Sequence, residues 1–584
     1  MSQNFDKIRH RVIGTVEFVS PKEIKVLLET DAPLNTSLNT GVPQLFPKIN
    51  GILLIPNEAG ALIGIITWIG IEYSPYPKRK GYKDFDLVDL PFPLRKLSLS
   101  PLGILKEKDG NYEIERGVYS YPSVGDIVII PSQEQLKAIV QNKDKNARIK
   151  IGVAPMAANA PVFVDPDKLF GRHLAILGNT GSGKSCSVSG LIRWSIEAAK
   201  KQIEENKNRQ NNNDEYNKSN VNARFIIFDP NGEYGNCFND LGNIKRYEVK
   251  IRENQGAQQL KVPSWMWNSW EWASITQASA KTQIPVIKKC LIEQKKNNNN
   301  QLYDEDTPVF FNQEELIKCI KESDLNKQEY NKSFLMRLDI LLKDTRVKSV
   351  IESEQKLTLE NWLNEYIGKN DSNPSITIID LSLLPSEILF LVVSVMARII
   401  FEAHHRFKKQ MGQTLPTVLV VDEAHNLIKR YETEDDNISA QRLCTQIFEK
   451  IAKEGRKFGV GLVLASQRPS ELSQTVLSQC NTFLLHRIVS DSDQEKVKKL
   501  VPDTMGGILN ELSVLPSRKA ILLGWATPIP VLVEMNELPE DQRPKSKDPE
   551  FWDVWINKEQ RKIDWGNIAK EWQQFKEADE GGTQ

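Results

Sequence analysis

The sequence lacks the patterns that mark a secreted, zinc-binding or membrane-spanning chain. It has no CxxC pair and no zinc-like spacing, and its first residues lack the apolar stretch of a signal peptide. The apolar runs at 51–71, interrupted by Asn57 and Glu58, and at 388–401 are interpreted as core segments, because a bilayer span needs about 20 apolar residues. We therefore expect a cytoplasmic protein without a membrane segment. The cysteines are predicted to be buried thiols in a reducing compartment: Cys186, Cys237, Cys290, Cys319, Cys444 and Cys480.

An excess of one charge is also missing, because basic and acidic side chains number 76 each. No overall charge draws the molecule towards nucleic acid or an anionic membrane, so any nucleic-acid contact has to be local. The length of 584 residues exceeds that of one ordinary domain and indicates about two to four structural units.

Residues 1–165 alternate short β-rich runs with turns that contain proline and glycine. The runs are GTVEFV, EIKVLLE, GILLIP, ALIGIITWIGI, DIVIIPS and ARIKIGV. This pattern favours a small antiparallel β-barrel followed by an extended connector.

From residue 174 onward the runs become continuously apolar, as in LAILG, RFIIFD, ITIIDL, TVLVVDE, VGLVLAS and TFLLHR. Strands that are apolar on both faces and separated by helical stretches indicate a parallel sheet covered by helices, an α/β fold over 166–540. Helical periodicity predicts a helical insertion at about 270–370 and a helical tail at 541–584. Three polar segments are predicted to be exposed loops: 206–220, 294–306 and 431–437.

Tryptophans gather in two places. In PSWMWNSWEW they favour a packed helical segment over a stacking platform for nucleic-acid bases. In the tail they stand among charged residues and predict docking onto a neighbouring surface. The first group is Trp265, Trp267, Trp270 and Trp272, and the second is Trp552, Trp555, Trp565 and Trp572.

Residues 178–185 read GNTGSGKS and match the pattern GxxxxGK[ST]. Its glycines let a loop close around phosphates, backbone N–H groups point at them, and the following helix adds its positive dipole end. The preceding LAIL and the helix-compatible stretch that follows make a plain glycine-rich turn the weaker interpretation. Lys184 is expected at the β- and γ-phosphates of ATP and Ser185 on Mg²⁺. The predicted nucleotide-binding residues are Gly178, Asn179, Thr180, Gly181, Ser182, Gly183, Lys184, Ser185 and Cys186.

Hydrolysis needs carboxylates as well as a phosphate loop, and VLVVDEAH supplies two at a strand end. Asp422 is suited to Mg²⁺, and Glu423 to orienting or deprotonating the attacking water. A DE pair at a strand end is more often only solvated. Together with the phosphate loop it becomes the expected second half of a hydrolytic site.

Two further side chains are candidates for the same chemistry. Gln467 ends the apolar strand in VGLVLASQRP, where its amide can contact both the γ-phosphate and the attacking water. A simple strand-end hydrogen bond is an equally weighted alternative. Arg456 in KEGRKFG has the planar charge that stabilises phosphoryl transfer, although the residues alone favour a surface arginine on a helix.

These strings together resemble the HerA family of hexameric ATPases, relatives of FtsK within the RecA-like P-loop class. The resemblance spans nearly the whole chain. It is carried by GRHLAILGNTGSGKS, IIFDPNGEY, IIDLSLLPSEI, VLVVDEAHN, KEGRKFGVGLVLASQRPSELSQTVLSQCNT and LPSRKAILLGWA. It implies a RecA-like core, and the β-rich N-terminal segment resembles that family's small barrel.

The resemblance also implies roles that spacing does not. Arg456 looks like an arginine finger that reaches a neighbouring subunit's nucleotide, and Arg172 resembles an arginine that assists in the ring's own ATP site. Glu233 in DPNGEY matches a core acidic position. Family members form rings by head-to-tail contacts, as a finger donated in trans requires. A homohexamer with double-stranded DNA in its central channel is therefore expected, acting as a DNA translocase and helicase.

Some family members act with a NurA-type nuclease in DNA end processing, and others with a nuclease or a sirtuin-like NAD-hydrolase in antiviral defence. The Asn-rich insertions and the Trp-rich tail depart from the recombination enzymes and lean towards a bacterial defence protein. A rival hypothesis is an ATP-switched ring scaffold that assembles and activates a partner effector. Protein remodelling is a third, against which the SQRPSELSQTVLSQCNT run argues by resemblance, since fold does not fix substrate.

Overall fold

The structure is a computed structural model in which two compact units are defined by their internal contacts, Met1–Pro544 and Lys545–Gln584. Of the predicted polar loops, 210–220, 297–301 and 432–437 lie outside the described residues. The described residues are 11–29, 36–37, 44–45, 48–72, 94–108, 111–141, 148–209, 221–249, 256–279, 281–296, 302–323, 336–340, 344–352, 357–369, 375–431, 439–501, 509–545, 551–556, 558 and 563–573.

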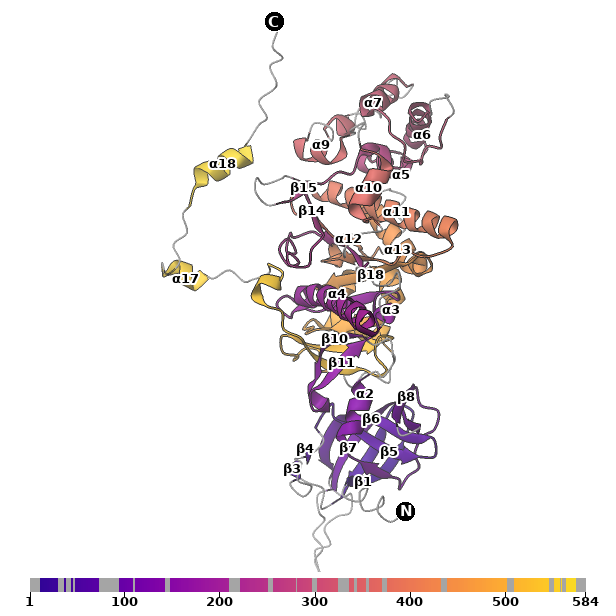
Figure 1. Cartoon of the computed structure of the whole chain (residues 1–584), viewed down its shortest axis with the longest axis vertical. Helices are drawn as coiled ribbons and strands as arrows, with labels where there is room; N and C mark the ends of the chain where they lie inside the picture. The colour runs from indigo at the N-terminus through magenta and orange to yellow at the C-terminus, as the bar shows by residue number, and fades with distance from the viewer. Residues whose placement is uncertain are drawn as a thin grey trace, which may run out of the picture. The chain divides into compact units, whose positions relative to one another are not determined.

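A closed six-stranded barrel opens the first unit (Figure 1). Its strand order is β2-β1-β9-β5-β6-β7, and β7 pairs back with β2, so the ring has no free edge. Alternate residues such as Ile24, Val26 and Leu28 fill its interior. The strands are β1 (Val12–Val19), β2 (Ile24–Leu28), β5 (Ile52–Asn57), β6 (Gly60–Glu72), β7 (Leu94–Lys108) and β9 (Ile127–Ile129), with β8 (Asn111–Arg116) paired to β7 outside the ring and β3 (Thr36–Ser37) paired to β4 (Gln44–Leu45).

A sheet of twelve strands forms the core of the first unit, in the order β11-β10-β21-β20-β19-β12-β18-β17-β13-β16-β14-β15. The eight strands from β19 to β15 run parallel, and the four at the other end pair antiparallel. β10 and β11 come from the predicted connector, and Gly152 of β10 pairs with Met535 of β21. The strands are β10 (Ile149–Ala154), β11 (Ala160–Val164), β12 (Leu174–Leu177), β13 (Arg224–Asp229), β14 (Ile244–Glu248), β15 (Gln258–Gln259), β16 (Ser375–Asp380), β17 (Thr417–Val421), β18 (Val460–Ser466), β19 (Thr482–Leu485), β20 (Lys519–Gly524) and β21 (Val531–Met535).

Helices cover both faces of the parallel strands, which confirms the predicted α/β fold. Leu174 and Ile176 of β12 pack in the cluster that contains α4, whereas Ala175 and Leu177 pack in the cluster of α11 and α13. Because both faces of the parallel sheet are buried, polar side chains that could take part in a reaction lie at the ends of the strands. The helices are α2 (Gln133–Val140), α3 (Pro166–Leu169), α4 (Lys184–Arg209), α11 (Ser386–Met411), α12 (Ala424–Leu427), α13 (Ala440–Phe458), α14 (Gln474–Gln479) and α15 (Asp491–Leu500).

Between β15 and β16 the chain forms the predicted helical insertion. Trp265, Trp267 and Trp272 are buried there, and Trp270 is 41% exposed, so the packed interpretation of this segment is confirmed for three of its tryptophans. Glu271 anchors the insertion through an ion pair of 2.7 Å with Arg398 of α11. Its helices are α5 (Ser269–Thr276), α6 (Gln283–Gln294), α7 (Gln313–Glu322), α9 (Thr345–Ile351) and α10 (Leu359–Tyr366).

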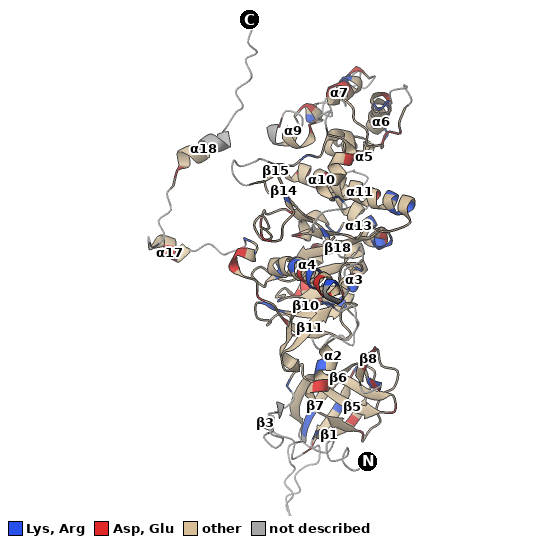
Figure 2. Cartoon of the chain, viewed as in Figure 1, with Lys and Arg blue, Asp and Glu red and all other residues tan. Residues whose placement is uncertain are grey.

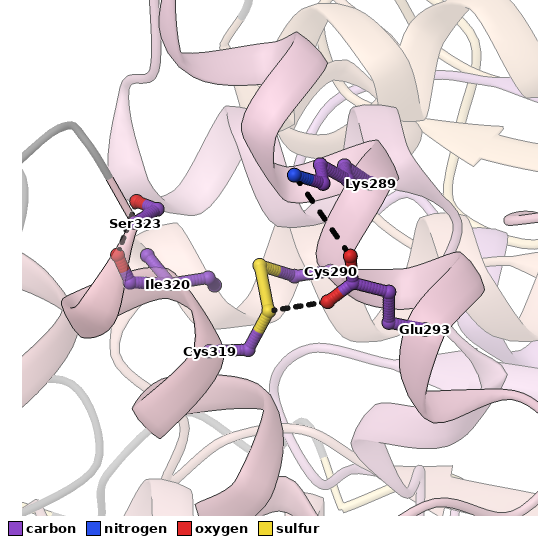
Figure 3. The surroundings of a disulfide bond; sticks show 6 residues. All are labelled: Lys289, Cys290, Glu293, Cys319, Ile320 and Ser323. Atoms are coloured by element: carbon purple, nitrogen blue, oxygen red, sulfur yellow. Dashed lines mark hydrogen bonds and ion pairs between the residues drawn. A yellow bond between two sulfur atoms is a disulfide. The ribbon is translucent and has the colours of Figure 1, made fainter.

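The prediction that all six cysteines are buried thiols is wrong for Cys290 and Cys319. They form a disulfide between α6 and α7, with a Cα–Cα distance of 5.8 Å (Figure 3). The two residues are 29 positions apart and become neighbours only when the two helices pack. The remaining cysteines are free, and Cys186 among them is half-buried instead of buried.

The second unit contains α17 (Phe551–Trp555) and α18 (Trp565–Gln573). Trp552, Trp555 and Trp565 are 68%, 68% and 69% exposed, and the side chain of Trp572 lies outside the described part of the chain. Docking of this tail stays a prediction. In the described parts of both units, no helix is long and apolar enough to cross a membrane. Figure 2 shows basic and acidic residues interspersed along α4, in keeping with the balanced composition.

Candidate active site

The predicted phosphate loop lies where a parallel strand ends and a helix begins. β12 ends at Leu177, and α4 begins at Lys184. Gly181 and Gly183 have φ of +69° and +104°, a backbone region that favours glycine, and these angles let the loop curl. Lys184 Nζ donates to the carbonyl of Asn179 at 3.0 Å, which holds the lysine over the loop. The other predicted residues, Gly178, Thr180, Ser182, Ser185 and Cys186, lie in this turn or in the first turn of α4.

Asp422 and Glu423 directly follow β17, which is separated from β12 by β18 alone. They are 2% and 7% exposed, and Asp422 Oδ1 accepts a hydrogen bond of 2.9 Å from the Glu423 N–H. Glu423 has φ +42° and ψ +46°, a left-handed conformation that costs a non-glycine residue about 1–2 kcal/mol. Such strain gathers at functional sites, where the surroundings hold the residue in place.

Negative charge exceeds positive charge in this part of the sheet edge. Burial raises the pKa of Asp422 to about 7, and the charge of Glu423 adds to the effect. Burial lowers the pKa of Lys184, while Glu423, Asp422 and Glu233 oppose the shift. Buried Oε2 atoms of Glu423 and Glu233 accept no hydrogen bond from the described residues. A small dication beside Ser185 and Asp422 fits this excess of negative charge.

Gln467, directly after β18, joins the loop to the carboxylate. Its Nε2 donates to Glu423 Oε1, and its Oε1 accepts from Thr180 Oγ1. On the other side of the carboxylate, His425 Nδ1 lies 3.3 Å from Glu423 Oε2 without hydrogen-bonding to it. The amide therefore spans the space between the phosphate loop and the general-base candidate.

The two predicted arginines lie at the opposite edge of the sheet. Arg172 precedes β12 by two residues, and Arg456 precedes the parallel strand β18 by four, so both lie at the edge where these strands begin. The four residues of β12 alone span about 13 Å. The structure thus brings Lys184, Asp422, Glu423 and Gln467 together and leaves Arg172 and Arg456 outside that group.

Sequence reasoning missed three side chains around the loop. Burial lowers the pKa of His486 to about 3, and its Nε2 lies 3.0 Å from Ser187 Oγ of α4. Burial also raises the pKa of Tyr234, with the charge of Asp422 adding to it. Tyr234 and His425 lie inside the strings that carry the family resemblance, whereas no motif marks His486.

A phosphate loop after β12 and a pair of acidic residues after the parallel strand β17, with β18 between the two strands, define a P-loop ATPase. The family model described as "Helicase HerA, central domain" matches residues 149–400. The chain is 25% identical over 471 residues to the DNA double-strand break repair helicase HerA of Sulfolobus acidocaldarius, covering 76% of this chain and 80% of that protein. Its identity to the Pyrococcus furiosus protein of the same name is 25% over 454 residues, covering 71% and 74%. These similarities support a HerA-type ATPase and agree with the resemblance found in the sequence.

Proposed function

We propose that this chain is an ATP-driven translocase and helicase that moves along double-stranded DNA as a homohexameric ring. This proposal rests on one observation: the hydrolytic groups lie at one edge of the parallel sheet, and at the other edge lie two arginines whose side chains make no hydrogen bond or ion pair with the described residues. We call the edge where the parallel strands begin the starting edge and the edge where they end the finishing edge. A complete ATP site then requires the starting edge of one subunit to meet the finishing edge of the next. Repeated head-to-tail contacts of this kind can close into a ring. Both relatives are named as DNA double-strand break repair helicases, which supports DNA as the substrate.

In the proposed site, backbone N–H groups of Asn179, Thr180, Gly181 and Ser182 bind the phosphates of ATP, and Lys184 reaches the β- and γ-phosphates. Cys186 lines the first turn of the helix behind them. Glu423 orients the attacking water and accepts its proton. Gln467, which contacts both Thr180 and Glu423, is placed to respond to the γ-phosphate.

Mg²⁺ is part of this proposal, with Ser185 and Asp422 as its protein ligands. Mg²⁺ commonly uses one or two protein groups together with substrate phosphates and water. This agrees with the finding that the described residues hold no group of three His, Cys, Asp or Glu side chains suited to a metal. When bound, the ion supplies positive charge that offsets the charge of the phosphates.

Arg456 and Arg172 complete the proposed site from the neighbouring subunit. Arg456 is exposed and Arg172 half-buried, and neither side chain makes a hydrogen bond or ion pair with the described residues. Their donors are therefore available to phosphate oxygens of a second chain. This arrangement keeps Arg172 in an ATP site of the ring, as the resemblance implies, and assigns it to the site of the neighbouring subunit.

The proposal is tested by Glu423→Gln in the full chain, with exposed Glu204→Gln of α4 as the matched control. We expect duplex DNA to stimulate ATP hydrolysis, and Glu423→Gln to lower the rate about 10²- to 10⁴-fold with unchanged binding of a fluorescent ATP analogue. The control should stay within about twofold. If neither duplex nor single-stranded DNA binds the ring or stimulates hydrolysis at low salt, the translocase proposal is wrong.

We also propose a partner effector, a NurA-like nuclease or a sirtuin-like NAD-hydrolase, in cytoplasmic antiviral defence or DNA end processing. The exposed tryptophans of the second unit support a docking role, because apolar surface of this kind marks interaction sites. The division into 1–165, 166–540 and 541–584 belongs to this proposal. Deletion of 546–584 should abolish co-purification of the partner and spare ATP hydrolysis. Hydrolysis that proceeds only with the partner bound would favour the ATP-switched scaffold instead.

A further inference from the structure

An exposed tryptophan lies beside one of the two arginines at the starting edge. Trp525 follows β20 and is 46% exposed. β20 runs antiparallel to β19, so its end lies where the parallel strands begin. There the guanidinium carbon of Arg172 lies 3.9 Å from the centre of the indole ring. This is a cation–π contact, so it holds the guanidinium in place while the N–H groups of Arg172 stay available as donors.

The turn that carries this tryptophan is held by an arginine attached to the barrel. Arg116, the last residue of β8, donates from Nη2 to the carbonyls of Gly524 and Trp525 at 3.0 Å each, and also to that of Thr527. Its guanidinium carbon lies 5.6 Å from the indole centre. Since β8 pairs with the barrel strand β7, the barrel contributes directly to the position of the indole ring.

Two positive charges therefore meet at one aromatic ring. Burial lowers the pKa of Arg116, and the charge of Arg172 lowers it further. Within the described chain, no carboxylate pairs with either guanidinium. The two like charges repel each other, and an anion beside them relieves the repulsion. The cluster is thus suited to face the phosphates of a nucleotide.

We propose that Trp525 is a positioning residue that sets the guanidinium of Arg172 for ATP hydrolysis in the neighbouring subunit, and that Arg116 couples this position to the barrel. The proposal rests on the proposed function, in which Arg172 acts in trans. It adds a route by which a ligand that shifts the barrel changes the turnover of the next ATP site.

The first test compares Trp525→Phe with Trp525→Leu in the full-length ring. Phenylalanine keeps an aromatic face, whereas leucine keeps apolar bulk alone. Loss of a cation–π contact corresponds to about 2- to 30-fold, so Trp525→Leu should lower kcat by about tenfold with little change in the KM for ATP. Trp525→Phe should retain at least about half of kcat. Ring size is measured by light scattering for both variants.

Two results would overturn the positioning role. One is equal kcat for the phenylalanine and leucine variants. The other is a loss of kcat that parallels a loss of ring assembly, which would make Trp525 only an interface contact.

The coupling of Trp525 to the barrel is tested with Arg116→Gln, with Arg95→Gln on β7 as the matched control. Arg95 also donates to a backbone carbonyl, that of Glu29, but far from Trp525 in the strand pairing. We expect Arg116→Gln to lower kcat and the control to leave it unchanged. The double variant with Trp525→Leu should be no slower than the slower single variant, because both act on one contact. Fully additive losses would exclude the coupling.

Co-expression of Arg172→Ala with Lys184→Ala chains separates this inference from the function on which it rests. Each chain is inactive alone, and with action in trans a randomly mixed ring recovers about a quarter of its sites. If the mixed rings recover ATP hydrolysis but Trp525→Phe and Trp525→Leu have equal kcat, only the role of Trp525 is overturned. No recovery in mixed rings of normal size would overturn action in trans, and the role of Trp525 with it.

Discussion

The two edges of the parallel sheet differ in how their functional groups are paired. At the finishing edge Lys184 contacts a loop carbonyl, and Gln467 bridges Thr180 and Glu423. At the starting edge Arg456 makes no side-chain hydrogen bond with the described residues. Unpaired charge is costly when buried and inexpensive when exposed. The groups at the finishing edge are therefore held by contacts within the chain, whereas Arg456 at the starting edge is left, in the proposed ring, to contact a second chain.

The largest effect should come from the starting edge. Arg456→Ala removes the proposed finger, and loss of such a group lowers phosphoryl-transfer rates about 10³- to 10⁵-fold. ATP binding, measured with a fluorescent analogue, should change little because Lys184 and its loop belong to the other edge. Arg456→Lys should stay impaired, since lysine lacks the planar fork.

Lys453→Ala is the matched control for this prediction. Lys453 is also exposed on α13, one turn before Arg456. A comparable loss in the control would show that general positive charge matters at this edge and that no single guanidinium is required.

A smaller effect is expected from breaking the pairing at the finishing edge. Gln467→Ala removes the link between Thr180 and Glu423, and loss of one oriented amide at a reacting centre costs about 10²-fold in kcat. Steady-state kinetics measures this, with exposed Gln479→Ala of α14 as the control. An unchanged kcat would leave Gln467 with only a strand-end hydrogen bond.

The smallest effect concerns His173, which hydrogen-bonds to two backbone groups near the starting edge. Its Nδ1 accepts from the Leu462 N–H at 3.0 Å, so its Nε2 carries the proton and donates to the carbonyl of Ala452 at 3.0 Å. Burial lowers the pKa of His173 to about 4, which means the folded state favours the neutral ring. Its contribution to stability is present above the unfolded pKa near 6.5 and is lost as pH falls towards about 4, by at most about 1.4 kcal/mol per pH unit.

Melting temperatures at pH 7 and pH 5 check this. At pH 7, His173→Gln should melt at a lower temperature than the unchanged protein. From pH 7 to pH 5, its melting temperature should fall by less. Parallel curves for the two proteins would contradict a neutral, structurally required His173.

Local patterns predicted the finishing edge well, and pairing across long separations was harder to foresee. The phosphate loop, Asp422 and Glu423 each follow a recognisable apolar strand. β7 was missed, since Pro101 and polar residues interrupt its apolar alternation, although this strand closes the barrel. The disulfide was missed because Cys290 and Cys319 meet only through helix packing. The position of Arg172 required the direction of β12 and its partners, which one sequence does not reveal.

The pairing of β10 with β21 has a consequence for synthesis. The barrel strands are complete by Ile129, so that ring can close early. Gly152, by contrast, finds its partner only when Met535 has been made, and at about 5–20 residues per second this delay is roughly 20 to 80 seconds. During that time β10 presents an unpaired edge on a nascent chain. The strand order therefore makes the pairing of β10 with β21 a late step when the chain folds during synthesis.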